Sequence, residues 1–113
     1  MIVTAWNIGT HNRNGSGYGF KVKNADRDAF FKKEWKSIFL ETEEESEPLE
    51  VVINSEKFWS ENGHEVVSPI IGKWLHKNGL APWRRGNPPT FEVEQLQDNH
   101  FKIIKLPKNK KSF

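Results

Sequence analysis

The best-marked element of this sequence is a short amphipathic helix that runs from Ser68 to Gly79. Ser68 is a favourable N-cap residue, and Pro69 suits the first helical position, where no backbone amide is needed. Gly79 offers the left-handed exit that ends many helices, and Leu80 can fold back onto the last turn as in a Schellman ending. The apolar stripe is Ile70, Ile71, Trp74 and Leu75, and the outward residues are Lys73, His76 and Lys77. The sequence therefore predicts a helix that covers a larger body with a single face.

Most of the other elements read as strands. Tyr18, Phe20 and Val22 alternate with small or polar residues, which is the period of a half-buried strand. Further strands are expected at 2–8, 36–42, 49–54, 64–67, around Phe91 and Val93, and at 100–106, with the acidic stretch 43–48 as a hairpin loop. A second helix is expected from Asn24, which can cap it, to Lys33.

The expected order of elements is ββαβββαββ, with seven strands and two short helices. Too few helices lie between the strands for a doubly wound parallel sheet, whose crossovers need them. We therefore expect a β-rich α+β fold, an open, seven-stranded, mostly antiparallel pseudobarrel. The helix at 68–79 would plug one end of this barrel.

The chain of 113 residues is expected to form one domain over residues 1–107, followed by a basic C-terminal tail at 108–113. Five Trp, eight Phe and one Tyr supply apolar area for a core. No apolar stretch is long enough to span a membrane, the first residues lack the pattern of a secretory signal, and there is no cysteine. These features favour a cytoplasmic protein without a membrane partner.

Acidic residues are concentrated in one short segment. Residues 41–50 hold six of the fifteen Asp and Glu residues. The other nine acids face 17 Lys and Arg, so the rest of the chain carries a net charge of +8. The acidic run is interpreted as a solvated loop, and what it leaves behind is a basic body whose local field bears on the choice of partner.

No catalytic, cofactor-binding or metal-binding motif stands out. The stretch His64–Ser68 begins like a zinc-protease motif but has serine in place of the second histidine. The glycine-rich stretch Gly15–Gly19 leads into an expected strand, whereas phosphate-cradling loops lead into a helix. His11, His76 and His100 lack paired carboxylates and read as surface residues. We therefore expect no enzyme activity, no cofactor and no metal.

Two loops carry more recognition chemistry than solvation alone requires. The loop 11–17 offers Arg13 for a phosphate or guanine contact, with Asn12 and Asn14 as amides that can pair with base edges. The loop 54–64 presents mixed donors and acceptors beside an aromatic ring, namely Lys57, Trp59, Ser60, Glu61, Asn62 and His64. Taken singly, each loop is explained slightly better as an ordinary polar connection.

The order of elements resembles that of the plant B3 DNA-binding domain and of the effector-sensing DNA-binding domains of some bacterial restriction enzymes. The likeness runs over residues 2–106. It rests on Gly19–Lys23 with the helix at 26–31, on Trp59–Asn62 and on Gly72–Leu80. The sequence is also similar to short bacterial proteins of the mobile gene-cassette kind.

In the B3 family the two corresponding loops form arms that grip the major groove of duplex DNA from either side. The resemblance therefore implies a small DNA-binding module whose partner is double-stranded DNA. Carried over by position, one arm would hold Arg13, Asn14 and Ser16, and the other would hold Lys57, Trp59, Ser60, Asn62 and His64.

Two other functions remain open from the sequence. Trp83, Arg84 and Arg85 combine residue types that are frequent in binding hot spots, which favours a non-enzymatic protein-interaction module or a homodimer. A barrel that binds a small molecule in an aromatic interior is the third interpretation, and no particular residue favours it.

Overall fold

The computed structural model of the chain describes residues 1–43, 45–53, 56–61 and 64–105. Asn62 and the expected basic tail lie outside the described residues. The described part contains seven strands and three short helices in the order ββαββαβαββ. The strands are β1 Ile2–Asn7, β2 Tyr18–Val22, β3 Ser37–Glu41, β4 Leu49–Val52, β5 Glu65–Val67, β6 Thr90–Gln97 and β7 His100–Lys105. The helices are α1 Asn24–Phe30, α2 Glu56–Trp59 and α3 Pro69–Lys77.

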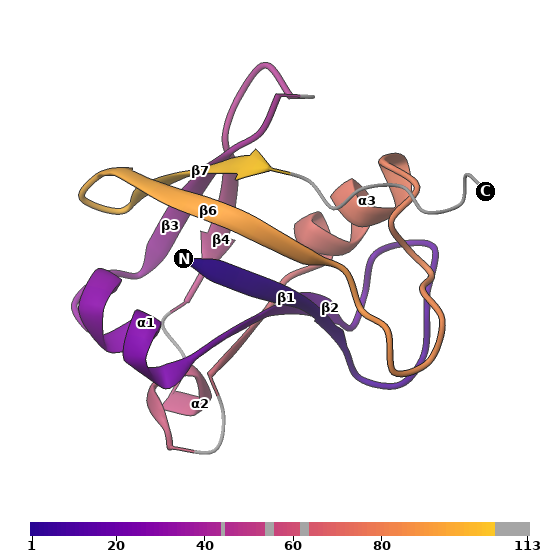
Figure 1. Cartoon of the computed structure of the whole chain (residues 1–113), viewed down its shortest axis with the longest axis horizontal. Coiled ribbons are helices and arrows are strands. Elements are labelled where there is room, and N and C mark those ends of the chain that lie inside the picture. Colours follow the sequence, from indigo (N-terminus) through magenta and orange to yellow (C-terminus); the bar gives the residue numbers. More distant parts are fainter. Residues whose placement is uncertain (44, 54–55, 62–63, 106–113) are drawn as a thin grey trace.

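All seven strands belong to one sheet, in the order β4-β3-β7-β6-β1-β2-β5 (Figure 1). Every pairing is antiparallel except that of β3 with β7, which is parallel. β4 and β5 form the two edges, so the sheet curls without closing. α1 and α2 lie towards one end of the molecule and α3 towards the other. The predicted β-rich α+β fold is confirmed, and the open, mostly antiparallel sheet is compatible with a pseudobarrel.

The prediction of only two helices is wrong. Glu56–Trp59, expected within a loop, forms the one-turn helix α2. One turn is too short to show a helical period in the sequence, and its stability comes from packing rather than from propensity. Phe58 supplies that packing because its side chain is fully buried. No helix in the described part of the chain has the length and apolar character needed to cross a membrane.

The first helix, α1, is shorter than expected and is capped differently. It ends at Phe30 rather than at Lys33, and Lys23 occupies the N-cap position that was predicted for Asn24. The side chain of Asn24 donates instead to the carbonyl oxygen of Glu61 at 3.4 Å. The residue that was expected to start α1 therefore ties this helix to the segment after α2.

The ends of α3 follow their sequence signals. Ser68 is the N-cap residue, although its side chain makes no capping hydrogen bond, and the chain leaves through Gly79 at φ +72°. The amide of Leu80 donates to the carbonyl oxygen of Leu75 at 2.9 Å, and the amide of Gly79 donates to that of His76 at 3.1 Å. This pair of bonds is the Schellman motif, so the predicted ending is confirmed.

The buried face of α3 is rotated slightly from the predicted stripe. Three of the predicted residues are buried, namely Ile71, Trp74 and Leu75. Ile70 is 38% exposed, whereas Gly72 is buried and His76 is half-buried. The rotation follows from the neighbour of the helix, because the β1–β2 connection packs on the side of Gly72.

Side chains fill the interior of the open barrel. The largest fully buried ones are Tyr18, Phe58, Phe91 and Phe101. Among the described residues the core leaves a cavity of only about 20 Å³ with apolar walls, which is no larger than the space of one water molecule. This cavity is therefore too small for a small-molecule ligand.

Candidate nucleic-acid interface

The first predicted loop belongs to the β1–β2 connection, residues 8–17, which lies beside α3 (Figure 1). Its tip rests on the backbone of the helix. A Cβ atom at Gly72 would overlap the carbonyl oxygen of Gly15, and a Cβ atom at Gly15 would overlap that of Pro69. The two glycines therefore allow a close backbone approach that a larger residue would prevent.

A cluster of four rings holds the base of the same loop. Tyr18, at the start of β2, is fully buried, and its hydroxyl shares a hydrogen bond of 2.6 Å with Nδ1 of His11. Nε2 of His76 on α3 donates to the carbonyl oxygen of Asn12 at 3.0 Å. Trp83 completes the cluster, with its ring centroid 4.7 Å from that of His11 and 5.6 Å from that of Tyr18. Both histidines are half-buried rather than the surface residues that the sequence predicts.

Burial favours the neutral form of two rings in this cluster, those of His11 and Tyr18. Burial lowers the pKa of His11 below its ordinary value, and the charge of the neighbouring His76 lowers it further. Burial also raises the pKa of Tyr18, which a side-chain hydrogen bond from Asn7 partly opposes. The ring cluster therefore joins the first loop, α3 and the segment after α3 through ring packing and hydrogen bonds.

Of the three residues predicted for the first arm, Arg13 is the most available. It is exposed, and no ion pair in the described part of the chain involves it. Asn14 is exposed too, but its Oδ1 accepts the amide of Ser16 at 2.9 Å. Ser16 is half-buried, and its carbonyl oxygen accepts Nδ2 of Asn12 at 3.3 Å. The first loop is thus a self-bonded turn that presents a cation and an amide NH₂ group.

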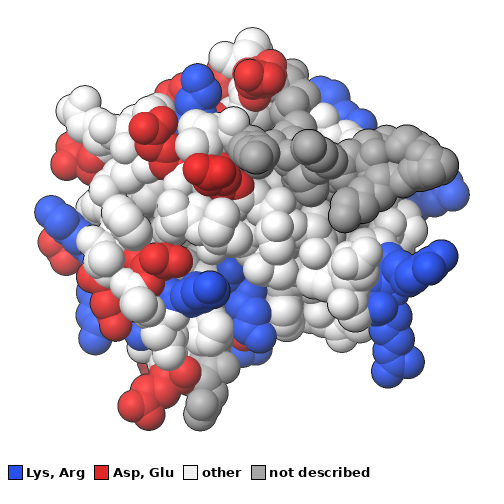
Figure 2. Space-filling model, in the orientation of Figure 1, with Lys and Arg blue, Asp and Glu red and all other residues white. Residues whose placement is uncertain are grey.

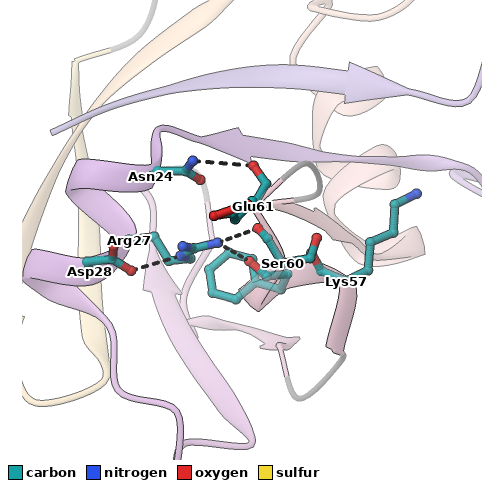
Figure 3. Close-up of polar contacts among 7 residues, drawn as sticks. Asn24, Arg27, Asp28, Lys57, Ser60 and Glu61 are labelled. Atoms are coloured by element: carbon teal, nitrogen blue, oxygen red, sulfur yellow. Dashed lines mark hydrogen bonds and ion pairs between the residues drawn. The ribbon is translucent and has the colours of Figure 1, made fainter.

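The second predicted loop is organised around Arg27 of α1 (Figure 3). The side chain of Arg27 is 7% exposed, and its Nη1 donates to the carbonyl oxygens of Phe58 and Ser60, both at 2.9 Å. Its Nε donates to Asp28 at 3.1 Å. Figure 3 shows the guanidinium reaching from α1 to the end of α2. Arg27 therefore joins α1 to two carbonyl groups, one in α2 and one directly after it.

Two residues of the second arm lie near the outer face of the sheet. The side chain of Lys57 is 66% exposed, with Nζ 3.5 Å from Oε1 of Glu65 and 5.8 Å from the ring centroid of Trp6 on β1. The hydroxyl of Ser60 donates to the carbonyl oxygen of Lys57 at 2.9 Å. Lys57 is therefore exposed but already close to a carboxylate.

The other described residues of the second arm are more enclosed. The half-buried ring of Trp59 lies near two cations, 5.3 Å from the guanidinium of Arg27 and 5.8 Å from Nζ of Lys33. His64 is half-buried and has a positive φ of 61°. In this conformation Trp59 packs on α1, and it does not form an open platform for a stacked base.

The two loops lie at opposite ends of β2. The first loop leads into Tyr18, and at the far end the amide of Val22 donates to the carbonyl oxygen of His64 at 3.1 Å. The structure therefore does not bring the two predicted sets together into one cluster. The outer face of β1, β2 and β5 lies between them, with Thr4, Lys21 and Glu65 in one cross-strand row and Trp6, Gly19 and Val67 in the next.

Charge is segregated along the chain and in space. Residues 1–25 and 66–91 contain seven Lys and Arg residues and no Asp or Glu. These stretches form β1, the first loop, β2, α3 and the segment between α3 and β6. At the right-hand end of the molecule, where Figure 1 shows the first loop and α3, the described atoms in Figure 2 include Lys and Arg side chains but no Asp or Glu. Both signs are mixed at the opposite end.

The acidic run of the β3–β4 connection reaches α3 at one point. Oε2 of Glu45 lies 2.8 Å from Nζ of Lys77. The run is therefore not only a solvated loop, as the sequence predicts, because one of its carboxylates neutralises a cation at the end of α3.

Sequence reasoning misses two residues that shape this surface. A glycine within a helical pattern signals a packing reason, so Gly72 carried a usable sign. Nothing local marks Arg27, because a buried arginine on a short helix has the same neighbours in sequence as a solvated one. The hot spot predicted at Trp83 also changes, since its ring packs in the ring cluster while Arg84 and Arg85 remain exposed.

The described ranges hold no group of three or more His, Asp or Glu side chains placed to bind a metal ion. Comparisons of the chain with protein-family models, with curated proteins and with solved structures give no match.

Proposed function

We propose that this chain is a small module that binds duplex DNA, with the two loops on either side of the contact surface. The observation that carries the proposal is the segregation of charge. Seven cations and no acid over residues 1–25 and 66–91 create a local field that attracts a polyanion, although the whole chain carries only +2. Cations that neutralise phosphates release counterions from DNA, and this release drives non-specific binding.

The spacing of the loops supports a duplex rather than a single strand. β2 has five residues, so its ends are about 14 Å apart, which is four steps of roughly 3.4 Å. The major groove of DNA is about 12 Å wide. Arms at the two ends of β2 therefore have the separation needed to reach the phosphates on both sides of one groove.

The residues have separate roles in this proposal. Arg13 on the first loop and Lys21 on the outer face between the loops would neutralise phosphates, which fixes register. Asn14 and Lys57 present donors that can reach base edges or further phosphates. The more enclosed residues hold the shape of the arms: Ser16, Trp59, Ser60 and His64.

Titration with duplex DNA of random sequence tests the proposal directly. We expect binding at about 50 mM salt, and the logarithm of the binding constant should fall linearly with the logarithm of salt concentration, by about 0.9 per phosphate contacted. Absence of binding at this low salt would show that the proposal is wrong.

Two double charge-reversal variants show whether binding depends on a defined surface or only on the net charge of the chain. Arg13→Glu with Lys21→Glu should weaken binding by about 10- to 100-fold, which corresponds to about 1.4 to 2.8 kcal/mol. Lys32→Glu with Lys36→Glu is the matched control, because it makes the same change of charge at two exposed residues outside the basic stretches. Equal losses in both variants would mean that net charge, and no particular surface, determines affinity.

A further inference from the structure

We propose that the segment between α3 and β6, residues 82–87, is a separate phosphate-binding element that grips the DNA backbone beside the first loop. This inference rests on the proposed function and adds a contact that neither loop supplies. Its cations are Arg84 and Arg85, which are both exposed. Its ligand is the sugar-phosphate backbone, read without regard to base sequence.

Trp83 fixes this segment against the first loop. Its half-buried ring packs edge-on against His11 at 88° and against Tyr18 at 72°. His11 and Tyr18 stand at the two ends of the first loop, so Trp83 is tied to both. The backbone then turns, because the amide of Asn87 donates to the carbonyl oxygen of Arg84 at 2.9 Å. The two arginines therefore extend from a held turn, which reduces the entropy lost when they bind.

Two other elements contribute cations in or beside the first loop. The backbone amide of Lys73 on α3 lies 2.8 Å from the Cβ position of Gly15, at the tip of the first loop. Arg13 is two residues before Gly15. Figure 1 shows the first loop, α3 and the α3–β6 segment at one end of the molecule, and Figure 2 shows that end rich in Lys and Arg. The arginine pair thus extends a basic surface that begins at the first loop.

These cations have no counter-charge among the described residues. Arg13, Lys73, Arg84 and Arg85 form none of the ion pairs in the described ranges. No Asp or Glu occurs between Glu65 and Glu92 in the sequence. Lys77 provides the contrast, because Glu45 neutralises it at 2.8 Å. An anion that binds the four cations has no internal pair to displace, and the surface ends where Lys77 is paired.

The chemistry of the segment favours phosphate over a protein partner. A guanidinium presents five N–H donors in a planar fork that matches phosphate oxygens in pairs. A protein hot spot would also use the apolar ring of Trp83, but that ring is engaged with His11 and Tyr18. Phosphate contacts position a protein on the duplex and carry no sequence information, so the contribution of this segment should be the same on any duplex.

The test compares Arg84→Ala/Arg85→Ala with the wild-type chain on two duplexes of unrelated sequence. We expect weaker binding to both by the same factor, and a salt slope that is smaller by up to about 1.8, since each lost phosphate contact removes about 0.9. Lys32→Ala/Lys36→Ala is the matched control and should keep the slope. Arg84→Lys/Arg85→Lys should also keep the slope, because it preserves both charges, while its affinity falls through the loss of paired hydrogen bonds.

The outcomes distinguish this inference from the proposed function. An unchanged salt slope in Arg84→Ala/Arg85→Ala overturns the inference, and the proposed function then still stands if Arg13→Glu/Lys21→Glu loses binding. A loss confined to one of the two duplexes also overturns it, because that result indicates a base contact. If the wild-type chain itself binds no duplex at low salt, the proposed function falls and the inference falls with it.

Discussion

The loops at the two ends of β2 are held in opposite ways. The first loop rests on α3 through a backbone contact between Gly15 and Gly72, and its base is fixed by rings from several elements. In the second loop, Arg27 of α1 donates to the carbonyl oxygens of Phe58 and Ser60, and the ring of Phe58 is fully buried. The first loop is thus fixed by a backbone contact and a ring cluster, whereas the second is fixed by a buried cation from α1 and by a ring in the core.

The two loops also differ in charge. The first contains Arg13 and no acid. The second contains Lys57 between Glu56 and Glu61, and this lysine lies 3.5 Å from Glu65. In the proposed function, this difference assigns the attraction of a polyanion to the first loop, and shape and short-range contacts to the second.

Removal of Arg27 should have the largest effect, and it should act on the second loop. Arg27→Ala removes this donor from the carbonyl oxygen of Phe58, which is buried, and from that of Ser60, where the bond is partly buried. Hydrogen bonds to charged groups contribute about 1.5 to 3 kcal/mol each, so we expect a loss of about 3 kcal/mol or more in the free energy of unfolding. Denaturant unfolding measures the loss. Amide hydrogen exchange should rise in residues 56–61 more than in residues 11–17.

Arg27→Lys is the informative control for that variant. A lysine keeps the charge, but its ammonium is a point donor and lacks the planar fork that reaches two carbonyl groups and Asp28 together. We expect an intermediate loss of stability. If Arg27→Lys is as stable as the wild type, the second loop depends on a buried charge and not on the geometry of the guanidinium.

A methyl group at Gly72 should have the next largest effect, and it should act on the first loop. The added Cβ atom would overlap the carbonyl oxygen of Gly15, so the loop must move or the helix must shift. Overpacking of this kind costs about 1 to 3 kcal/mol. Amide exchange should rise in residues 11–17 and stay unchanged at 56–61. Gly79→Ala is the control, because it strains a left-handed helix exit with no atom in the way and should leave the first loop in place.

Gly72, Gly79 and Arg27 show which features of the fold can be predicted from the sequence and which cannot. The limits of α3 were predictable because Ser68, Pro69 and Gly79 act on backbone next to them in the chain. The one-turn helix α2 was not predictable, because a carbonyl oxygen of this helix accepts a hydrogen bond from Arg27, about thirty residues earlier in the chain. The parallel pairing of β3 with β7 is equally non-local, since residues 39–41 pair with residues 100–102.

The same limit applies to the candidate site. The sequence located the first loop and its exposed Arg13, because exposed polar residues in connections can be recognised from composition, and it named the exposed Lys57, although Lys57 lies on α2 and not in a loop. It could not show that His11 and His76 join a ring cluster, since α3 brings His76 onto Asn12 only in the fold. Nor could residue types reveal that Trp59 packs on α1 rather than facing outwards. The residue types in each loop could be recognised from the sequence, whereas the contacts of each side chain could not.

Charge reversal in each loop should have a smaller effect, in kcal/mol, on DNA binding than the two changes above have on stability. The two charge-reversal variants compare the loops directly. Arg13→Glu should weaken binding to duplex DNA by about tenfold, or about 1.4 kcal/mol, because an unpaired cation is replaced by an anion. Lys57→Glu should cost less, since Glu65 already offsets part of the field of Lys57. Titrations at one low salt concentration measure both. If Lys57→Glu has the larger effect, the division of roles between the loops is reversed.

The smallest expected effect is a dependence of stability on pH that belongs to the first loop. The folded chain lowers the pKa of His11 below 6.5, first by burial and then through the charge of His76. Between the folded and unfolded pKa values the unfolded chain binds more protons, so stability rises with pH in this window. The contribution should be complete above about pH 7, decline as the pH falls through 6.5, and level off below the folded pKa.

Thermal unfolding of the wild type and of His11→Gln across this range isolates that contribution. Glutamine does not titrate and can still bond the hydroxyl of Tyr18, while His64, His76 and His100 remain in both proteins. The difference between the two stability curves should therefore slope upwards with pH through 6.5. A flat difference would mean that His11 is protonated as easily in the fold as in the unfolded chain. The ring cluster would then hold the loop by packing alone, and protonation of His11 would leave the first loop as firmly attached to α3 as before.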